Sequence, residues 1–178
     1  MSNIEKTLNR KDIFSGRIIN VHVDDVELEN GKPGYREVVD HPGGVCVACR
    51  TRDGELLFVR QFRYPYHEQC LELPAGKLEK GEDPFEAVKR ELMEETGCTG
   101  KNWKFCGNLY PSPGYCGEII RLWCCEVDSE TGTQQLDEDE FVECERIPLK
   151  KAVDMVMNNE IPDAKTQVLV LKAAMLCQ

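Results

Sequence analysis

The chain has 178 residues and a formal net charge of −10, with 30% charged and 41% hydrophobic residues. A chain of this length suits one compact domain with a small appendage, and it can bury a sizeable core. The acidic balance argues against a nucleic-acid binder or a protein of anionic membrane surfaces, because both need a basic surface. An anionic substrate would therefore need local positive charge, from arginine side chains or bound cations.

The N-terminal stretch MSNIEKTLNRKD lacks the basic and then apolar order of a signal peptide. No apolar run approaches the roughly 20 residues that span a bilayer, so we expect a cytoplasmic protein. The 10 cysteines are scattered, and most resemble small buried hydrophobic residues. Cys46 and Cys49 form a C-x-x-C pattern, but no second pair completes a zinc site, and they lie in a strand-like run rather than at a helix start.

The first 40 residues are expected to form a small antiparallel sheet of their own. In IFSGRIINVHVDDVEL, from residue 13 to 28, apolar and polar side chains alternate as they do in a strand. Asn30-Gly31 predicts a hairpin turn, after which GYREVVDH resumes the strand pattern.

The break at His41-Pro42-Gly43-Gly44 predicts the start of the main domain, residues 41–178. Its first strands, VCVACRT and ELLFVRQFR, are joined at Asp53-Gly54. Arg60 and Arg63 lie near the end of the second strand, where arginines are commonly solvated or paired with acidic residues.

A well-signalled helix follows the stretch LELPAG. Asp83 can cap its start with Glu86 three residues later, and Pro84 falls at the first helical position. Gly97 is suited to end the helix. One face is apolar and is expected to pack on the core, because three apolar residues recur at helical spacing: Phe85, Val88 and Leu92.

The remaining segments predict further strands and two closing helices. We expect strands in three segments, an acidic loop before the last of them, and helices after it: strands at 103–110, 117–127 and 141–148, the loop at 128–140, and helices at 149–159 and 164–176. This mixture indicates helices packed on a mixed sheet.

The helix also carries three glutamates, Glu91, Glu94 and Glu95, whose carboxylates project from one face. Like charges at this spacing destabilise a helix by about 0.2–0.5 kcal/mol per pair, so a cation should compensate for them. Arg90 can bind carboxylates through forked hydrogen bonds, and Mg²⁺ takes oxygen ligands of this kind. The alternative is a solvated acidic face.

The residues around these glutamates complete a specific pattern. Gly76, Glu82 and the segment Arg90–Gly97 resemble the signature of the Nudix hydrolases, G-x5-E-x7-R-E-U-x-E-E-x-G-U, in which U is a bulky aliphatic residue. All seven fixed polar and glycine positions are present, and Cys98 occupies the last U position. The resemblance implies an α/β/α sandwich and hydrolysis of nucleoside diphosphates linked to another group, with Mg²⁺ or Mn²⁺.

The resemblance also implies roles for individual residues. Three helix glutamates and one backbone carbonyl would hold the metal: Glu91, Glu94, Glu95 and Ala75. Arg90 would orient these glutamates, and Glu82, Gly76 and Gly97 would support the site. Bound cations would neutralise a pyrophosphate and polarise the attacking water.

A loop downstream narrows the resemblance to ADP-ribose pyrophosphatases. Pro113 lies 16 residues after Gly97, within SPGYCGE, which is similar to their S-P-G-x-x-x-E loop. In those enzymes the loop glutamate helps to position or deprotonate the water, so Glu118 is the expected base. The alternative is an ordinary glutamate at a strand start.

In the relatives, the N-terminal strands are exchanged between the subunits of a homodimer. The resemblance implies that Arg36 and Glu37 reach the partner's adenosine site and that Arg63 contacts the substrate. The expected reaction converts ADP-ribose and water to AMP and ribose 5-phosphate. Two alternatives remain: another nucleoside diphosphate sugar, such as GDP-mannose or ADP-glucose, or a non-catalytic nucleotide-binding module.

Overall fold

The computed structural model describes residues 4–130, 132–136 and 141–176. Backbone contacts divide the chain into two compact units. The N-terminal unit contains the described residues up to 43 and residues 110–119. The sandwich unit contains residues 44–109 and the described residues from 120 onward. Of the helices in these ranges, none has the length and apolar character needed to cross a membrane.

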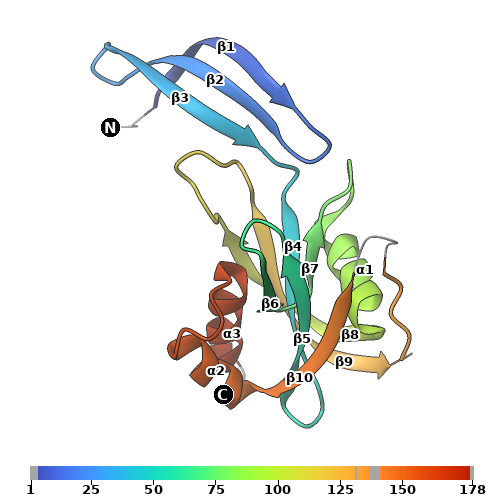
Figure 1. Ribbon diagram of the computed structural model, residues 1–178. Helices are drawn as coiled ribbons and strands as arrows, with labels where there is room; N and C mark the ends of the chain where they lie inside the picture. The colour runs from blue at the N-terminus through green and yellow to red at the C-terminus, as the bar shows by residue number, and fades with distance from the viewer. Residues whose placement is uncertain (1–3, 131, 137–140, 177–178) are drawn as a thin grey trace. The chain divides into compact units, whose positions relative to one another are not determined.

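The N-terminal unit contains a three-stranded antiparallel sheet (Figure 1), with the strands in the order β1 (Lys6–Ser15), β2 (Asn20–Glu27) and β3 (Pro33–Asp40). The hairpin at Asn30-Gly31 is confirmed, since Gly31 has a φ of 74° and its N–H donates to the Leu28 carbonyl at 2.8 Å. The extended stretch at residues 13–28 contributes to two strands, β1 and β2. A turn closed by the Gly16 N–H and the Ile19 carbonyl at 2.9 Å divides it, and the apolar pattern continues through that turn.

Residues 110–119 belong to the same unit and attach to the end of β3. The Val39 N–H donates to the Tyr115 carbonyl at 2.8 Å, and the Gly117 N–H donates to the Val39 carbonyl at 2.9 Å. These two bonds form a parallel bridge between Val39 and Cys116. The loop SPGYCGE is therefore held by the N-terminal sheet.

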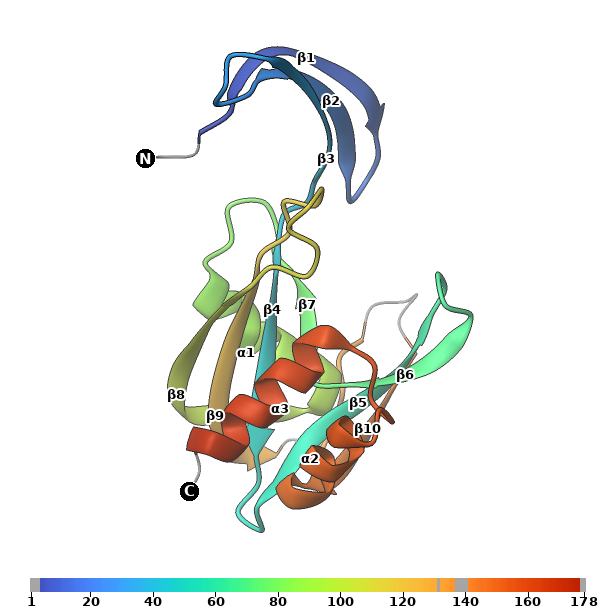
Figure 2. The ribbon, with the colours of Figure 1, turned by 90° about the vertical axis from the view of Figure 1, so that its left-hand side faces the viewer.

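The described strands of the sandwich unit form a seven-stranded mixed sheet, in which β4 and β9 pair in parallel and the other pairs of these strands are antiparallel. The core order is β10-β5-β4-β9-β8, with β6 beside β5 and β7 beside β4. The strands are β4 (Gly44–Arg50), β5 (Glu55–Arg63), β6 (Glu68–Glu72), β7 (Ala75–Lys77), β8 (Cys98–Leu109), β9 (Ile120–Glu130) and β10 (Val142–Pro148). Helix α1 (Pro84–Thr96) covers one face, and α2 (Leu149–Met157) and α3 (Ala164–Leu176) cover the other (Figure 2). The predicted α/β/α sandwich with a separate small sheet is confirmed.

The alternating side chains of the inner strands form two cores, one on each face of the sheet. Phe58 packs in the cluster beneath α2 and α3, whereas its neighbour Leu57 packs in the cluster beneath α1. Cys46 and Cys49 are fully buried on opposite faces for the same reason, so they cannot share a metal ion. The nine described cysteines are all free thiols.

Strands β8 and β9 are longer than the sequence pattern predicts. β8 was expected to start at residue 103, but it starts at Cys98, which pairs with Glu130 at the end of β9. The small and polar residues at the start of β8 do not alternate with apolar ones, so the sequence pattern does not predict a strand there. Pairing with β9 fixes this part of the strand instead.

Candidate active site

Helix α1 begins and ends where the sequence predicts. The Asp83 carboxylate accepts the N–H groups of Phe85 at 2.9 Å and Glu86 at 3.2 Å, and Pro84 is the first helical residue. At the other end Gly97 is left-handed, with a φ of 67°, and its N–H donates to the Met93 carbonyl at 2.8 Å. These caps fix the register of the helix and therefore the direction of its glutamates.

Two of the three helix glutamates are buried, so the alternative of a solvated acidic face is wrong. Glu91 is 9% exposed and Glu95 is 4% exposed. The strand β7 covers them, because the Ala75 N–H donates to Glu95 Oε2 at 2.9 Å. A Cβ atom on Gly76 would lie only 1.9 Å from Glu91 Oε1, so a glycine is needed for this close approach.

Arg90 binds three carboxylates around the helix. Its Nε lies 2.9 Å from Glu82 Oε1, and its Nη1 lies 2.9 Å from Glu91 Oε1 and 2.8 Å from Glu94 Oε2. The hydrogen bond from Arg90 lowers the pKa of Glu82, and the same bond raises the pKa of Arg90. One guanidinium therefore orients the acidic side chains without matching their charge.

Among the described side chains, no three acidic, histidine or cysteine groups converge as a ready-made metal cluster. Glu91 and Glu94 share Arg90 Nη1, whereas Glu95 accepts the Ala75 N–H. Their donor set nevertheless fits a hard divalent cation, since all its atoms are oxygens and two of the carboxylates are buried in excess of nearby positive charge.

Arg63 is held in a second ionic cluster, which the sequence reasoning missed. Its Nε and Nη2 each donate to the Glu72 carboxylate at 2.6 Å. Lys165 also donates to Glu72 and lies 3.1 Å from Asp163 Oδ1. The charged residues that could have indicated this cluster in the sequence are Glu72, just before LPAG, and Asp163 and Lys165 in IPDAKT.

The other predicted site residues lie in the N-terminal unit. Arg36 donates from Nε to Glu5 at 2.9 Å, and Glu37 is an exposed residue of β3. Pro113 lies in the loop at 110–119, and Glu118 Oε1 lies 3.4 Å from His41 Nδ1. The structure therefore groups the predicted residues into two sets, one on each unit.

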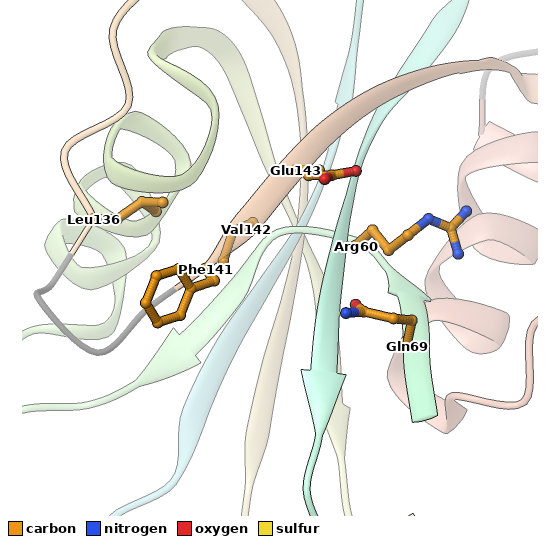
Figure 3. A pocket seen from close by; sticks show the side chains of 6 residues that line it. All are labelled: Arg60, Gln69, Leu136, Phe141, Val142 and Glu143. Atoms are coloured by element: carbon orange, nitrogen blue, oxygen red, sulfur yellow. The ribbon is translucent and has the colours of Figure 1, made fainter. Parts of the chain in front are cut away.

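A pocket of about 490 Å³ opens at the β10 side of the sandwich unit (Figure 3). Its lining combines apolar and polar residues: Arg60, Gln69, Leu136, Phe141, Val142 and Glu143. Arg60 Nε lies 2.6 Å from Glu145 Oε1, so the paired alternative for this arginine is confirmed. None of the predicted site residues lines this pocket.

Comparison with known families identifies the class of protein. Residues 40–168 match the NUDIX domain, so the chain belongs to the Nudix family. Residues 5–39 match the nucleoside diphosphate sugar hydrolase N-terminal domain, and the chain is a hydrolase of that class. The predicted division after residue 40 remains a prediction, because backbone contacts assign residues 110–119 to the N-terminal unit.

Individual relatives cover nearly the whole chain. It is 45% identical to the ADP-ribose pyrophosphatase of Bacillus subtilis, over 98% of this chain and 97% of that protein. It is 41% identical to the methanol dehydrogenase activator of Bacillus methanolicus, over 93% and 90%. The GDP-mannose pyrophosphatase of Yersinia enterocolitica is 30% identical, over 96% and 93%. A crystal structure of an ADP compounds hydrolase shares the fold, with a TM-score of 0.83 at 21% identity, covering 97% of this chain and 93% of that one.

Proposed function

We propose that this chain is a Mg²⁺-dependent pyrophosphatase that hydrolyses ADP-ribose to AMP and ribose 5-phosphate. The observation that carries the proposal is the arrangement of the signature residues, in which buried Glu91 and Glu95 face the β7 backbone and Arg90 orients Glu82 and Glu94. The relative named ADP-ribose pyrophosphatase supports the choice of substrate.

The metal would be held by oxygen atoms of the chain: the carboxylates of Glu91, Glu94 and Glu95, and the carbonyl of Ala75. When bound, Mg²⁺ or Mn²⁺ neutralises the diphosphate and polarises the attacking water. Arg90 keeps the helix carboxylates oriented, and Gly76 leaves the space that Glu91 needs.

Glu118 is the proposed base that accepts the proton of the attacking water at a carboxylate oxygen. The neighbouring His41 Nδ1 accepts the Gly43 N–H at 3.0 Å, so this nitrogen is occupied as an acceptor. It then cannot also donate to Glu118, so His41 Nδ1 does not take up a lone pair of the carboxylate.

A second subunit would supply part of the substrate site. Arg36, Glu37 and Pro113 are proposed to contact the nucleotide, and Arg63 to contact an anionic part of it. Strand β1 supports a homodimer, because it exposes three large apolar side chains, Leu8, Ile13 and Phe14, each at least 55% exposed. A cytoplasmic location is part of the same proposal.

The test is a panel of nucleoside diphosphate sugars hydrolysed by the purified chain with Mg²⁺. We expect ADP-ribose to give the highest kcat/KM, with AMP and ribose 5-phosphate as the products. GDP-mannose is the second candidate, because a relative that is 30% identical carries that name. A panel led by GDP-mannose or ADP-glucose would overturn the choice of ADP-ribose. No hydrolysis of any member would favour a binding module.

A further inference from the structure

The second ionic cluster links Arg63 to the first turn of α3 through a chain of contacts. Arg63 is bound by both oxygens of Glu72, and Glu72 Oε2 is shared with Lys165. Lys165 Nζ in turn lies 3.1 Å from Asp163 Oδ1. The other oxygen of Asp163, Oδ2, accepts the Thr166 N–H at 2.9 Å in the first turn of α3. The start of a helix thereby fixes the position of a side chain on β5.

The backbone beside Glu72 is anchored to the same helix. The Leu73 N–H donates to Thr166 Oγ1 at 2.9 Å, and Thr166 is fully buried. Two ties, one from a side chain and one from the backbone, therefore set where the Glu72 carboxylate lies. Because Lys165 holds the Glu72 carboxylate and Thr166 holds the adjacent backbone, the guanidinium that Glu72 binds has little freedom to move.

The side chains of the cluster become more exposed to solvent from Lys165 and Glu72 to Arg63. The Glu72 side chain is 3% exposed and that of Lys165 is 10% exposed, whereas that of Arg63 is 37% exposed. Arg63 uses Nε and Nη2 for Glu72. Among the described residues, Nη1 makes no hydrogen bond, so the exposed end of the cluster presents unused donors of a fixed guanidinium.

Lys165 also shares the carboxylate that binds Arg63. A lone Arg63–Glu72 pair would be neutral, and its field on an anion would be weak. Because Lys165 shares the carboxylate, Glu72 is not neutralised by Arg63 alone, and Asp163, 3.1 Å from Lys165, brings the four groups to charge balance. Burying a lysine is unfavourable unless it is paired, and Glu72 and Asp163 pair Lys165 here.

We propose that Lys165 is a positioning residue for substrate binding: through Glu72 it holds the Arg63 guanidinium in place for an anionic group of the nucleoside diphosphate sugar. The proposal rests on the proposed function, in which Arg63 contacts the substrate. Lys165 is too buried to take that contact itself.

A double-mutant cycle between Lys165 and Arg63 tests the proposal. We expect Lys165→Met to raise KM for ADP-ribose about 10-fold with kcat changed less than about twofold, because a misplaced guanidinium loses uniform binding. Lys165→Arg keeps the charge and should restore most of the affinity. In an Arg63→Ala background, Lys165→Met should change KM by less than about twofold, since its effect passes through Arg63.

Val170→Ala is the matched control, because Val170 is a fully buried residue of the same helix that packs in the apolar cluster. It should lower Tm without changing KM. If Lys165→Met does not fold, Asp163→Asn tests the same linkage and should raise KM about threefold. An equal effect of Lys165→Met with and without Arg63, or an unchanged KM, would overturn the proposal.

Calorimetric binding of ADP-ribose in EDTA, measured for the same variants, separates this proposal from the proposed function. The same pattern should appear in Kd. A chain that binds ADP-ribose with this pattern but does not hydrolyse it would overturn the catalytic function and leave the role of Lys165 standing. If the panel is led by another sugar, the cycle is run with that sugar, and only the choice of ADP-ribose is overturned.

Discussion

Two ionic clusters lie within the sandwich unit, and they differ in charge balance. Around α1, one guanidinium, that of Arg90, faces the carboxylates of Glu82, Glu91 and Glu94, and Glu95 adds a further buried charge. Around α3, two cations and two carboxylates balance: Arg63, Lys165, Glu72 and Asp163. The acidic cluster has more carboxylates than cationic side chains, which suits the proposed binding of a divalent cation, whereas the balanced cluster suits the proposed positioning of Arg63, its most exposed member.

The pKa directions agree with this contrast. Burial alone would raise the pKa of Glu72, but the hydrogen bonds and charges of Arg63 and Lys165 outweigh it and lower that pKa. Burial alone would lower the pKa of Lys165, but Asp163 and Glu72 raise it. Both groups are therefore held in their charged forms by each other, without an external ion.

The sharpest test of the acidic cluster is Glu95→Gln, for which we expect the largest effect. Turnover should fall about 100- to 1,000-fold, because the amide removes one of the charges proposed to hold the metal. Steady-state hydrolysis of ADP-ribose measures the change. Folding should be preserved, since the amide oxygen can still accept the Ala75 N–H.

Glu86→Gln is the matched control for this test. Glu86 lies on the same helix but is exposed, and it pairs with Lys89 at 2.7 Å. Its substitution should change turnover by less than about twofold. Equal losses in the two variants would remove the distinction between signature and surface glutamates.

The sequence predicts the acidic cluster better than the balanced one because the acidic cluster is local. Asp83, Pro84 and Gly97 fix α1 by short-range caps, so the direction of its glutamates follows from helix geometry. Glu72 and Lys165 are 93 residues apart in the chain, and no periodicity joins them. Their contact depends on how α3 packs on the sheet, which is tertiary information.

A similar limit applies to the fold. The hairpin at Asn30-Gly31 was predictable because a turn type selects those residues, whereas β1 was missed before residue 13 because every residue in it is exposed. The burial of Glu91 and Glu95 was also hidden, since it comes from β7, a strand of three residues whose position depends on pairing with β4.

The balanced cluster should make the free energy of unfolding depend on pH. Glu72→Gln leaves Arg63 and Lys165 without their shared carboxylate, which should cost about 3–5 kcal/mol of unfolding free energy at pH 7. Glu72 has a folded pKa below its usual value of 4.5, so its contribution is complete above that pH and is lost as pH falls through the folded pKa.

Urea unfolding of both proteins between pH 7 and pH 3 measures this effect. The difference between wild type and Glu72→Gln should stay constant above about pH 4.5 and shrink below it. A difference in unfolding free energy that is independent of pH would mean that the lost stability comes from packing. The charge of Glu72 would then not stabilise the cluster.

The smallest expected effect is the stabilisation of the acidic cluster by its proposed cation. Mg²⁺ at ten times its Kd should stabilise the chain by about 1.4 kcal/mol. For 178 residues this corresponds to a rise in Tm of about 3–6 °C. Glu95→Gln should lose most of the rise, and Glu86→Gln should keep it, with NaCl at equal ionic strength as the reference. If Mg²⁺ and NaCl raise Tm equally in all three proteins, the excess of carboxylates does not mark a cation site, and the contrast between the two clusters would need another cause.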